Sequence, residues 1–95
     1  SNKTKMGTKG TWAKSGDILL CRVGSRVVGK TRDYKGQDIL ISDCIFLIRF
    51  KSKDRKNAFW KYINSDVGSG HLLSLSRGVC SRYLTKQDLL QFAFH

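Results

Sequence analysis

The sequence predicts an α+β fold with a small mixed or antiparallel sheet, one main helix and a short C-terminal helix. Apolar runs with strand-like alternation fill the first half of the chain. Apolar residues at helical spacing follow, and residues 85–88 form a helix-capping sequence near the C-terminus. A chain of 95 residues can enclose one modest core, so we expect a single domain.

The first 15 residues, SNKTKMGTKGTWAKS, are basic, rich in Gly, Ser and Thr, and show no apolar periodicity. This composition predicts a flexible basic arm over residues 1–15. Residues 16–95 would then form the folded domain, which we expect to be a fragment of a larger protein.

The stretch GDILLCRV (16–23) predicts the first strand, with apolar residues on both sides. Gly and Ser at 24–25 predict a tight turn, and β-branched residues over 26–32 predict the returning strand of a hairpin. The longest strand is expected over residues 39–50, at the centre of the sheet. Its apolar face would consist of Cys44, Phe46, Ile48 and Phe50.

Residues 54–65 are predicted to form the main helix, with Asp54 as its N-cap. Its apolar stripe would consist of Phe59, Tyr62 and Ile63. A second, short helix is expected over 71–75, after a break at the GSG sequence.

The last element is predicted to be a helix over residues 86–92. In TKQD, the Thr85 hydroxyl can accept from the third helical amide while Asp88 reaches back to the cap. Leu84 before the cap and Leu89 after it form the hydrophobic staple that accompanies such a start.

The stretch GSRVVGKT (24–31) matches the pattern G-x-x-x-x-G-K-[ST] of a phosphate-binding P-loop. A P-loop leads from a strand into a helix, whose free amide groups hold the phosphates. Here the next residues are RDYKGQD, which have no helical periodicity, and Val27 and Val28 favour a strand. We therefore interpret the stretch as part of a hairpin.

The charge balance points to a polyanionic partner. Eighteen Lys and Arg residues oppose seven Asp, which gives a net charge of +11. Such an excess is typical of nucleic-acid-binding domains, although it also serves to keep a small domain soluble. There is no long apolar run, so we expect no membrane segment and a cytoplasmic location.

Catalytic chemistry is not indicated. Three separated cysteines and two histidines show neither metal-ligand spacing nor a nucleophile–base pair, so we expect no cofactor and no activity in this domain alone. The basic residues gather instead near two turns, the one at 24–25 and a Gly-containing turn predicted within SLSRGVCSRYLT (74–85). Trp12, Tyr34 and Tyr83 are available to stack on bases. The candidate DNA-contacting residues are Lys14, Arg22, Ser25, Arg26, Lys30, Arg32, Ser76, Arg77 and Arg82.

Four stretches in order, GDILLCRVGSRVVGK, ISDCIFLIRFK, FWKYINS and RGVCSRYLTKQDLLQF, give the chain a recognisable pattern. It resembles the target-recognition domains of bacterial restriction–modification systems, found in type I specificity subunits and TaqI-like adenine-N6 DNA methyltransferases. The resemblance spans about residues 16–92 and implies recognition of double-stranded DNA. Catalysis would then belong to a separate domain or subunit, and no Asn-Pro-Pro-Tyr/Phe methyltransferase motif occurs here.

Charge and resemblance together suggest two roles for the candidates. Lys14, Lys30 and Arg32 would anchor phosphates, and Arg26, Arg77 and Arg82 would read bases. Two other functions stay open at this point: a protein-interaction module for an acidic protein or a methyltransferase subunit, and a small RNA-binding domain.

Overall fold

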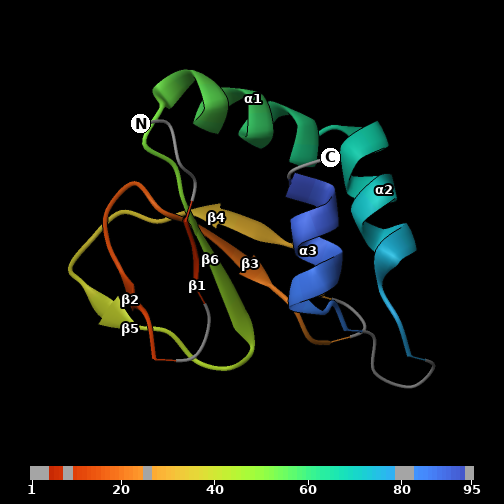
Figure 1. Ribbon diagram of the computed structural model, residues 1–95, viewed down its shortest axis with the longest axis horizontal. Helices are drawn as coiled ribbons and strands as arrows, with labels where there is room; N and C mark the ends of the chain where they lie inside the picture. Colours follow the sequence, from red (N-terminus) through yellow and green to blue (C-terminus); the bar gives the residue numbers. More distant parts are fainter. Residues whose placement is uncertain (1–4, 8–9, 25–26, 79–82, 94–95) are drawn as a thin grey trace.

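The computed structural model describes residues 5–7, 10–24, 27–78 and 83–93 (Figure 1). Six strands precede three helices in the described chain. They are β1 (Lys5–Gly7), β2 (Trp12–Ala13), β3 (Ile18–Cys21), β4 (Thr31–Asp33), β5 (Ile39–Leu40), β6 (Ile45–Arg49), α1 (Lys53–Ile63), α2 (Asp66–Leu75) and α3 (Lys86–Ala93). The predicted α+β class is confirmed.

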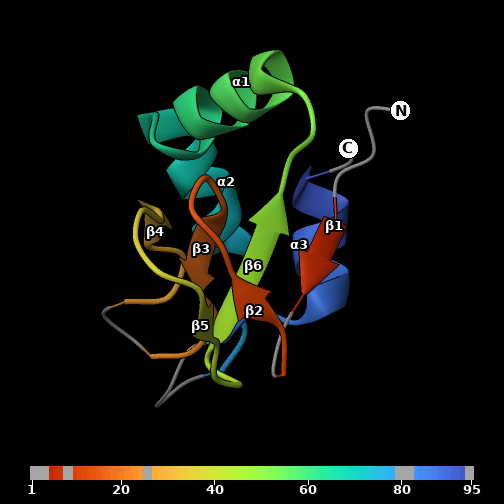
Figure 2. The same cartoon turned by 90° about the vertical axis from the view of Figure 1, so that its left-hand side faces the viewer.

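The strands form two antiparallel sheets. The larger sheet has the order β1-β6-β3-β4, and the smaller one pairs β2 with β5. The helices cover one face of the larger sheet, while β2 and β5 lie over the other (Figures 1 and 2). Strand β6 therefore lies in the middle layer, between β1 and β3, as expected for a central strand.

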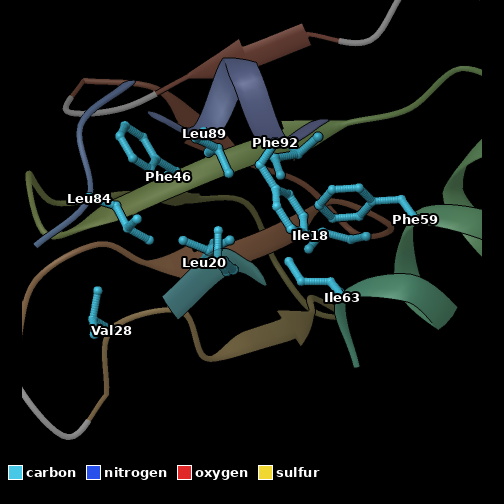
Figure 3. Packing of buried hydrophobic residues seen from close by; sticks show 11 residues of the cluster. Ile18, Leu20, Val28, Phe46, Phe59, Ile63, Leu84, Leu89 and Phe92 are labelled. Carbon is cyan, nitrogen blue, oxygen red and sulfur yellow. The ribbon is translucent and has the colours of Figure 1, made fainter. Parts of the chain in front are cut away.

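The main core lies between the larger sheet and the helices. Ile18 and Leu20 of β3 and Phe46 and Ile48 of β6 provide the sheet side (Figure 3). The remaining buried members are Val28, Phe59, Ile63, Leu72, Leu84, Leu89 and Phe92. A second, smaller cluster on the opposite face contains Ala13, Ile41 and Leu47, with Leu19, Tyr34 and Ile45 packed against it. Both faces of β6 are thus largely covered, which accounts for the apolar run from Ile45 to Ile48.

The predicted strand over 39–50 is two strands that belong to different sheets. A turn separates them, in which the Ile45 amide donates to the Ser42 carbonyl at 3.3 Å and the Cys44 amide donates to the Ser42 hydroxyl at 3.3 Å. Cys44, expected on the apolar face, is exposed for this reason. Alternating apolar residues gave no sign of the turn, because the pattern continues through it.

Within the predicted arm over residues 1–15, the described part contains two paired strands. Strand β1 pairs with β6, and β2 pairs with β5, whose Ile39 lies opposite the fully buried Ala13. Strands of two or three residues are too short to show an apolar alternation. Their partners also lie more than 25 residues away in sequence, as in the pair Ala13 and Ile39.

The predicted hairpin is confirmed by the antiparallel pairing of β3 with β4, but its turn is longer than two residues. Residues 27–29 lie in a turn, where the Val28 amide donates to the Gly24 carbonyl at 2.9 Å. Val28 is 5% exposed and packs into the main core, which draws it away from a strand position. Strand β4 follows Lys30 directly, where a P-loop would need a helix.

Helices α1 and α2 begin earlier than predicted. Ser52, and not Asp54, caps α1, and its hydroxyl accepts from the Arg55 amide at 3.3 Å. Ser65 caps α2 by accepting from the Gly68 amide at 3.0 Å, so the GSG sequence lies inside the helix. The helix continues through the glycines because Gly68 packs against the backbone of α1.

The capping box of α3 is confirmed. The Asp88 amide donates to the Thr85 hydroxyl at 3.1 Å, and the Thr85 amide donates to Asp88 Oδ2 at 3.0 Å. Leu84 and Leu89 are both fully buried in the main core, as the predicted staple requires.

The contact at Gly68 yields a stability test with an internal control. A Cβ atom at Gly68 would lie 1.8 Å from the Tyr62 carbonyl oxygen, whereas one at Gly70 would meet nothing within 4 Å. We expect Gly68→Ala to destabilise the fold by about 1–3 kcal/mol or more. Gly70→Ala in the same helix should stabilise it by about 0.5–1 kcal/mol. Urea unfolding of both variants measures the difference, and equal effects would contradict the packing of α2 on α1.

Candidate nucleic-acid interface

Most Asp residues lie beside a cation of the chain itself. Five of the seven form ion pairs with described cations, which are Arg49–Asp17 at 2.8 Å, Arg77–Asp88 at 2.8 Å, Lys56–Asp33 at 3.0 Å, Lys14–Asp38 at 3.4 Å and Arg22–Asp43 at 3.5 Å. The other two, Asp54 and Asp66, lie in the first turns of α1 and α2, where the helix dipole favours a negative charge. The surplus positive charge therefore rests on cations without a carboxylate partner.

Two of these cations border a groove of about 420 Å³. Leu19 and Cys21 of β3 and Ile45 of β6, all half-buried, form its apolar floor. Lys30 and Arg32 line the same groove and are exposed. We call this feature the β4 groove, after the edge strand beside it.

Strand geometry places both cations on the same side of the sheet. Arg32 lies opposite Leu19 in the register, and the Cys21 amide donates to the Lys30 carbonyl at 2.9 Å. Residues paired in this way project to one face of an antiparallel sheet. Leu19 packs on the smaller cluster, so this is the face away from the helices. Neither Lys30 nor Arg32 forms an ion pair with any carboxylate of the described residues.

Arg77, predicted to read bases, is engaged in a bidentate pair. Its Nε and Nη2 donate to the two carboxylate oxygens of Asp88 at 3.1 and 2.8 Å. This hydrogen bonding raises the pKa of Arg77, and with the contacts from Thr85 it holds the pKa of Asp88 well below its usual range. A base contact through the same two nitrogen atoms would have to break the pair. The geometry therefore gives Arg77 a structural role at the start of α3.

Arg22 also faces inward. Its guanidinium lies 4.8 Å from the centre of the Phe46 ring, and Nη1 donates to the Asp43 carbonyl at 3.4 Å. Nη1 also lies 3.5 Å from Asp43 Oδ1, in an ion pair at the surface. Because Phe46 belongs to the main core, Arg22 is directed away from the β4 groove.

The remaining candidates are dispersed. Lys14 is exposed and paired with Asp38 on the smaller sheet. The Ser76 hydroxyl donates to the Leu73 carbonyl at 2.7 Å and so closes the end of α2. Ser25, Arg26 and Arg82 lie outside the described residues.

The two predicted basic turns do meet at their bases. Arg77 and Tyr83 exchange backbone hydrogen bonds of 2.8 and 2.9 Å, and Tyr83 also bridges to Val23. The Leu84 amide donates to the Arg22 carbonyl at 2.7 Å. The segment that follows β3 and the segment that precedes α3 are therefore joined side by side, with Tyr83 40% exposed between them.

Sequence reasoning missed the groove floor. Leu19 and Cys21 were expected only on the second apolar side of the predicted strand 16–23. Ile45 was expected on the side of the predicted strand 39–50 opposite its apolar face. The signal was the apolar second side of two strands, Leu19 with Cys21 and Ile45 with Leu47, against a covering sheet of only two residues per strand. A cover that short leaves part of the face open.

Within the described residues, there is no group of three or more His, Cys, Asp or Glu side chains that could hold a metal ion. None of the described helices is long and apolar enough to cross a membrane. A scan against protein-family models and a search of curated proteins found no match to the chain.

The Arg77–Asp88 pair predicts a specific response to acid. Because the folded pKa of Asp88 lies below the unfolded one, its stabilisation is complete above the unfolded value and is lost as the pH falls below about 4. We expect Asp88→Asn to lower Tm at pH 7 by roughly 5–10 °C. The difference in Tm between the variant and the native chain should then narrow as the pH falls below about 4.

The control is Asp54→Asn, which removes an exposed carboxylate that pairs with no described cation. It should leave Tm at pH 7 nearly unchanged. A gap for Asp88→Asn that stays constant from pH 7 to pH 2.5 would show that the ion pair does not stabilise the fold.

Proposed function

We propose that this domain binds nucleic acid, with double-stranded DNA as the expected ligand, through the sheet face that carries Lys30 and Arg32. The observation that supports the proposal most is this pair of cations beside the β4 groove, which no described carboxylate neutralises. A protein gains nucleic-acid affinity when such cations replace the counterions condensed on phosphates.

The spacing of the two cations suits a phosphate backbone. Residues two apart on a strand are separated by about 6.6 Å and point to the same side. Lys30 and Arg32 can therefore serve neighbouring phosphates of one strand, the arginine with a bidentate fork and the lysine as a point charge. These contacts would fix the position of the domain on the duplex without reading sequence.

Sequence reading would then fall to the two joined turns. Tyr83 links their bases, and residues 25–26 and 79–82, which carry Arg26 and Arg82, lie next to this junction in the chain. This arrangement agrees with the resemblance to target-recognition domains, in which recognition is separate from catalysis. On this proposal, DNA methylation or cleavage is performed by a separate methyltransferase or restriction enzyme, either as another domain or as another subunit.

A second candidate function rests on a different surface. Trp12 and Leu40, paired in the register of the smaller sheet, are 54% and 55% exposed. An exposed tryptophan beside an exposed leucine is typical of protein-protein contacts. The domain would in that case be a protein-interaction module, for example for a catalytic subunit.

The DNA proposal is tested by a matched pair of double variants. Lys30→Ala with Arg32→Ala removes the groove cations, and Lys53→Ala with Arg55→Ala removes one exposed lysine and one exposed arginine from α1. We expect the groove variant to weaken binding to random duplex DNA. The negative slope of log affinity against log salt should become shallower by about 1.8, because each lost phosphate contact removes about 0.9 from its magnitude. The α1 variant should leave the slope nearly unchanged.

Fluorescence anisotropy between about 50 and 200 mM salt measures both quantities. Equal effects of the two double variants would show that net charge alone acts, and no binding at micromolar protein and low salt would exclude the proposal. Trp12→Ala should leave DNA affinity unchanged. The interaction module would be favoured by two results together. The native domain would show no affinity for DNA, and Trp12→Ala would abolish its binding to a catalytic subunit.

A further inference from the structure

We infer that the β4 groove holds one sugar-phosphate strand of the nucleic acid and selects deoxyribose over ribose. This inference rests on the proposed function and adds a chemical selectivity to the same site. It depends on the contrast between the charged border of the groove and its apolar floor.

A concave groove suits the convex backbone of a duplex. The β4 groove of about 420 Å³ has the size of sites that enclose small organic groups. With phosphates on Lys30 and Arg32, the sugar between them would lie over Leu19, Cys21 and Ile45. These three side chains come from neighbouring strands and are aligned by the register, in which Cys21 pairs with Ile45.

The three floor side chains offer almost nothing to a hydroxyl group. Leu19 and Ile45 carry no polar atom, and a thiol such as that of Cys21 is a weak hydrogen-bonding group. Thr31 also lines the groove, but its register position opposite Leu20 directs its side chain to the helix-covered face. The positive groups of Lys30 and Arg32 would be occupied by phosphate.

A ribose 2′-hydroxyl placed on this floor would lose its water without gaining a partner. Such an unpaired hydroxyl lowers affinity by roughly tenfold. Deoxyribose has only C–H groups at that position and loses nothing. The 2′-hydroxyl is also the feature by which proteins separate RNA from DNA at a single site.

The experiment moves one ribonucleotide along a DNA duplex that has been selected for tight binding from a random library. A single substitution keeps the duplex close to its DNA geometry, so the shape of an RNA duplex does not enter. At one or two neighbouring positions of one strand, we expect affinity to fall about tenfold. At the other positions, affinity should stay within about twofold of the all-DNA duplex.

Ile45→Thr tests whether the floor causes the effect, because its hydroxyl gives the ribose a partner. The penalty at the sensitive positions should shrink to about twofold. Val67→Thr, at a residue of α2 that is 74% exposed, is the matched control and should keep the full penalty. Val27→Thr on the groove wall, 41% exposed, gives the same test with less risk to folding.

The outcomes separate this inference from the proposed function. Tight binding with no sensitive position would overturn the selectivity and leave DNA binding intact. A penalty that persists in both Ile45→Thr and Val27→Thr would place the discrimination outside the β4 groove and also overturn the inference. Absence of binding to every duplex would end both proposals.

Discussion

The bidentate pair between Arg49 and Asp17 joins the parts of this domain that are far apart in sequence. Arg49 Nε and Nη2 donate to the two carboxylate oxygens of Asp17 at 2.9 and 2.8 Å, and Nη2 also donates to the Trp12 carbonyl at 3.0 Å. Asp17, only 2% exposed, further accepts from the Lys14 amide at 2.7 Å. The end of β6, the entry to β3 and the end of β2 meet at one carboxylate. Because a buried carboxylate is tolerated only when it is fully bonded, this junction strongly favours one arrangement of the two sheets.

The β4 groove follows from that arrangement. The junction holds β2, and with it β5, over one part of the larger sheet, where Ala13, Ile41 and Leu47 form the smaller cluster. Two strands of two residues cannot cover the whole face, so Leu19 and Ile45 reach from this cluster into open space beside β4. Apolar surface and unpaired cations consequently lie together. This combination is what the proposed function uses, and it results from the placement of β2 and β5 and not from a local motif.

Several structural features that depend on neighbouring residues could be predicted from the sequence, whereas the pairing of distant strands could not. The capping box at Thr85 and Asp88, the hairpin of β3 with β4, and the α+β class could be predicted because each depends on residues close together in the chain. The pairing of β1 with β6 depends on contacts at least 40 residues apart, such as Lys5 with Arg49, and short strands carry no pattern that reveals it. At Gly68, packing against Tyr62 overrides the low helix propensity of glycine. The groove is a consequence of distant pairings and was missed with them.

The distribution of charge separates the structural cations from those available to a ligand. A carboxylate in a buried position demands a cation or backbone donors, and here Asp17 and Asp88 each take a bidentate arginine. Arginines that looked alike in the sequence, such as Arg32 and Arg77, therefore differ in role. Arg77 lies beside the buried Asp88 and pairs with it. Arg32 lies on the edge strand β4, and the next residue, Asp33, points to the helix side and pairs with Lys56. Alternation along β4 keeps this carboxylate away from the groove, so the positive charge at its border remains unneutralised.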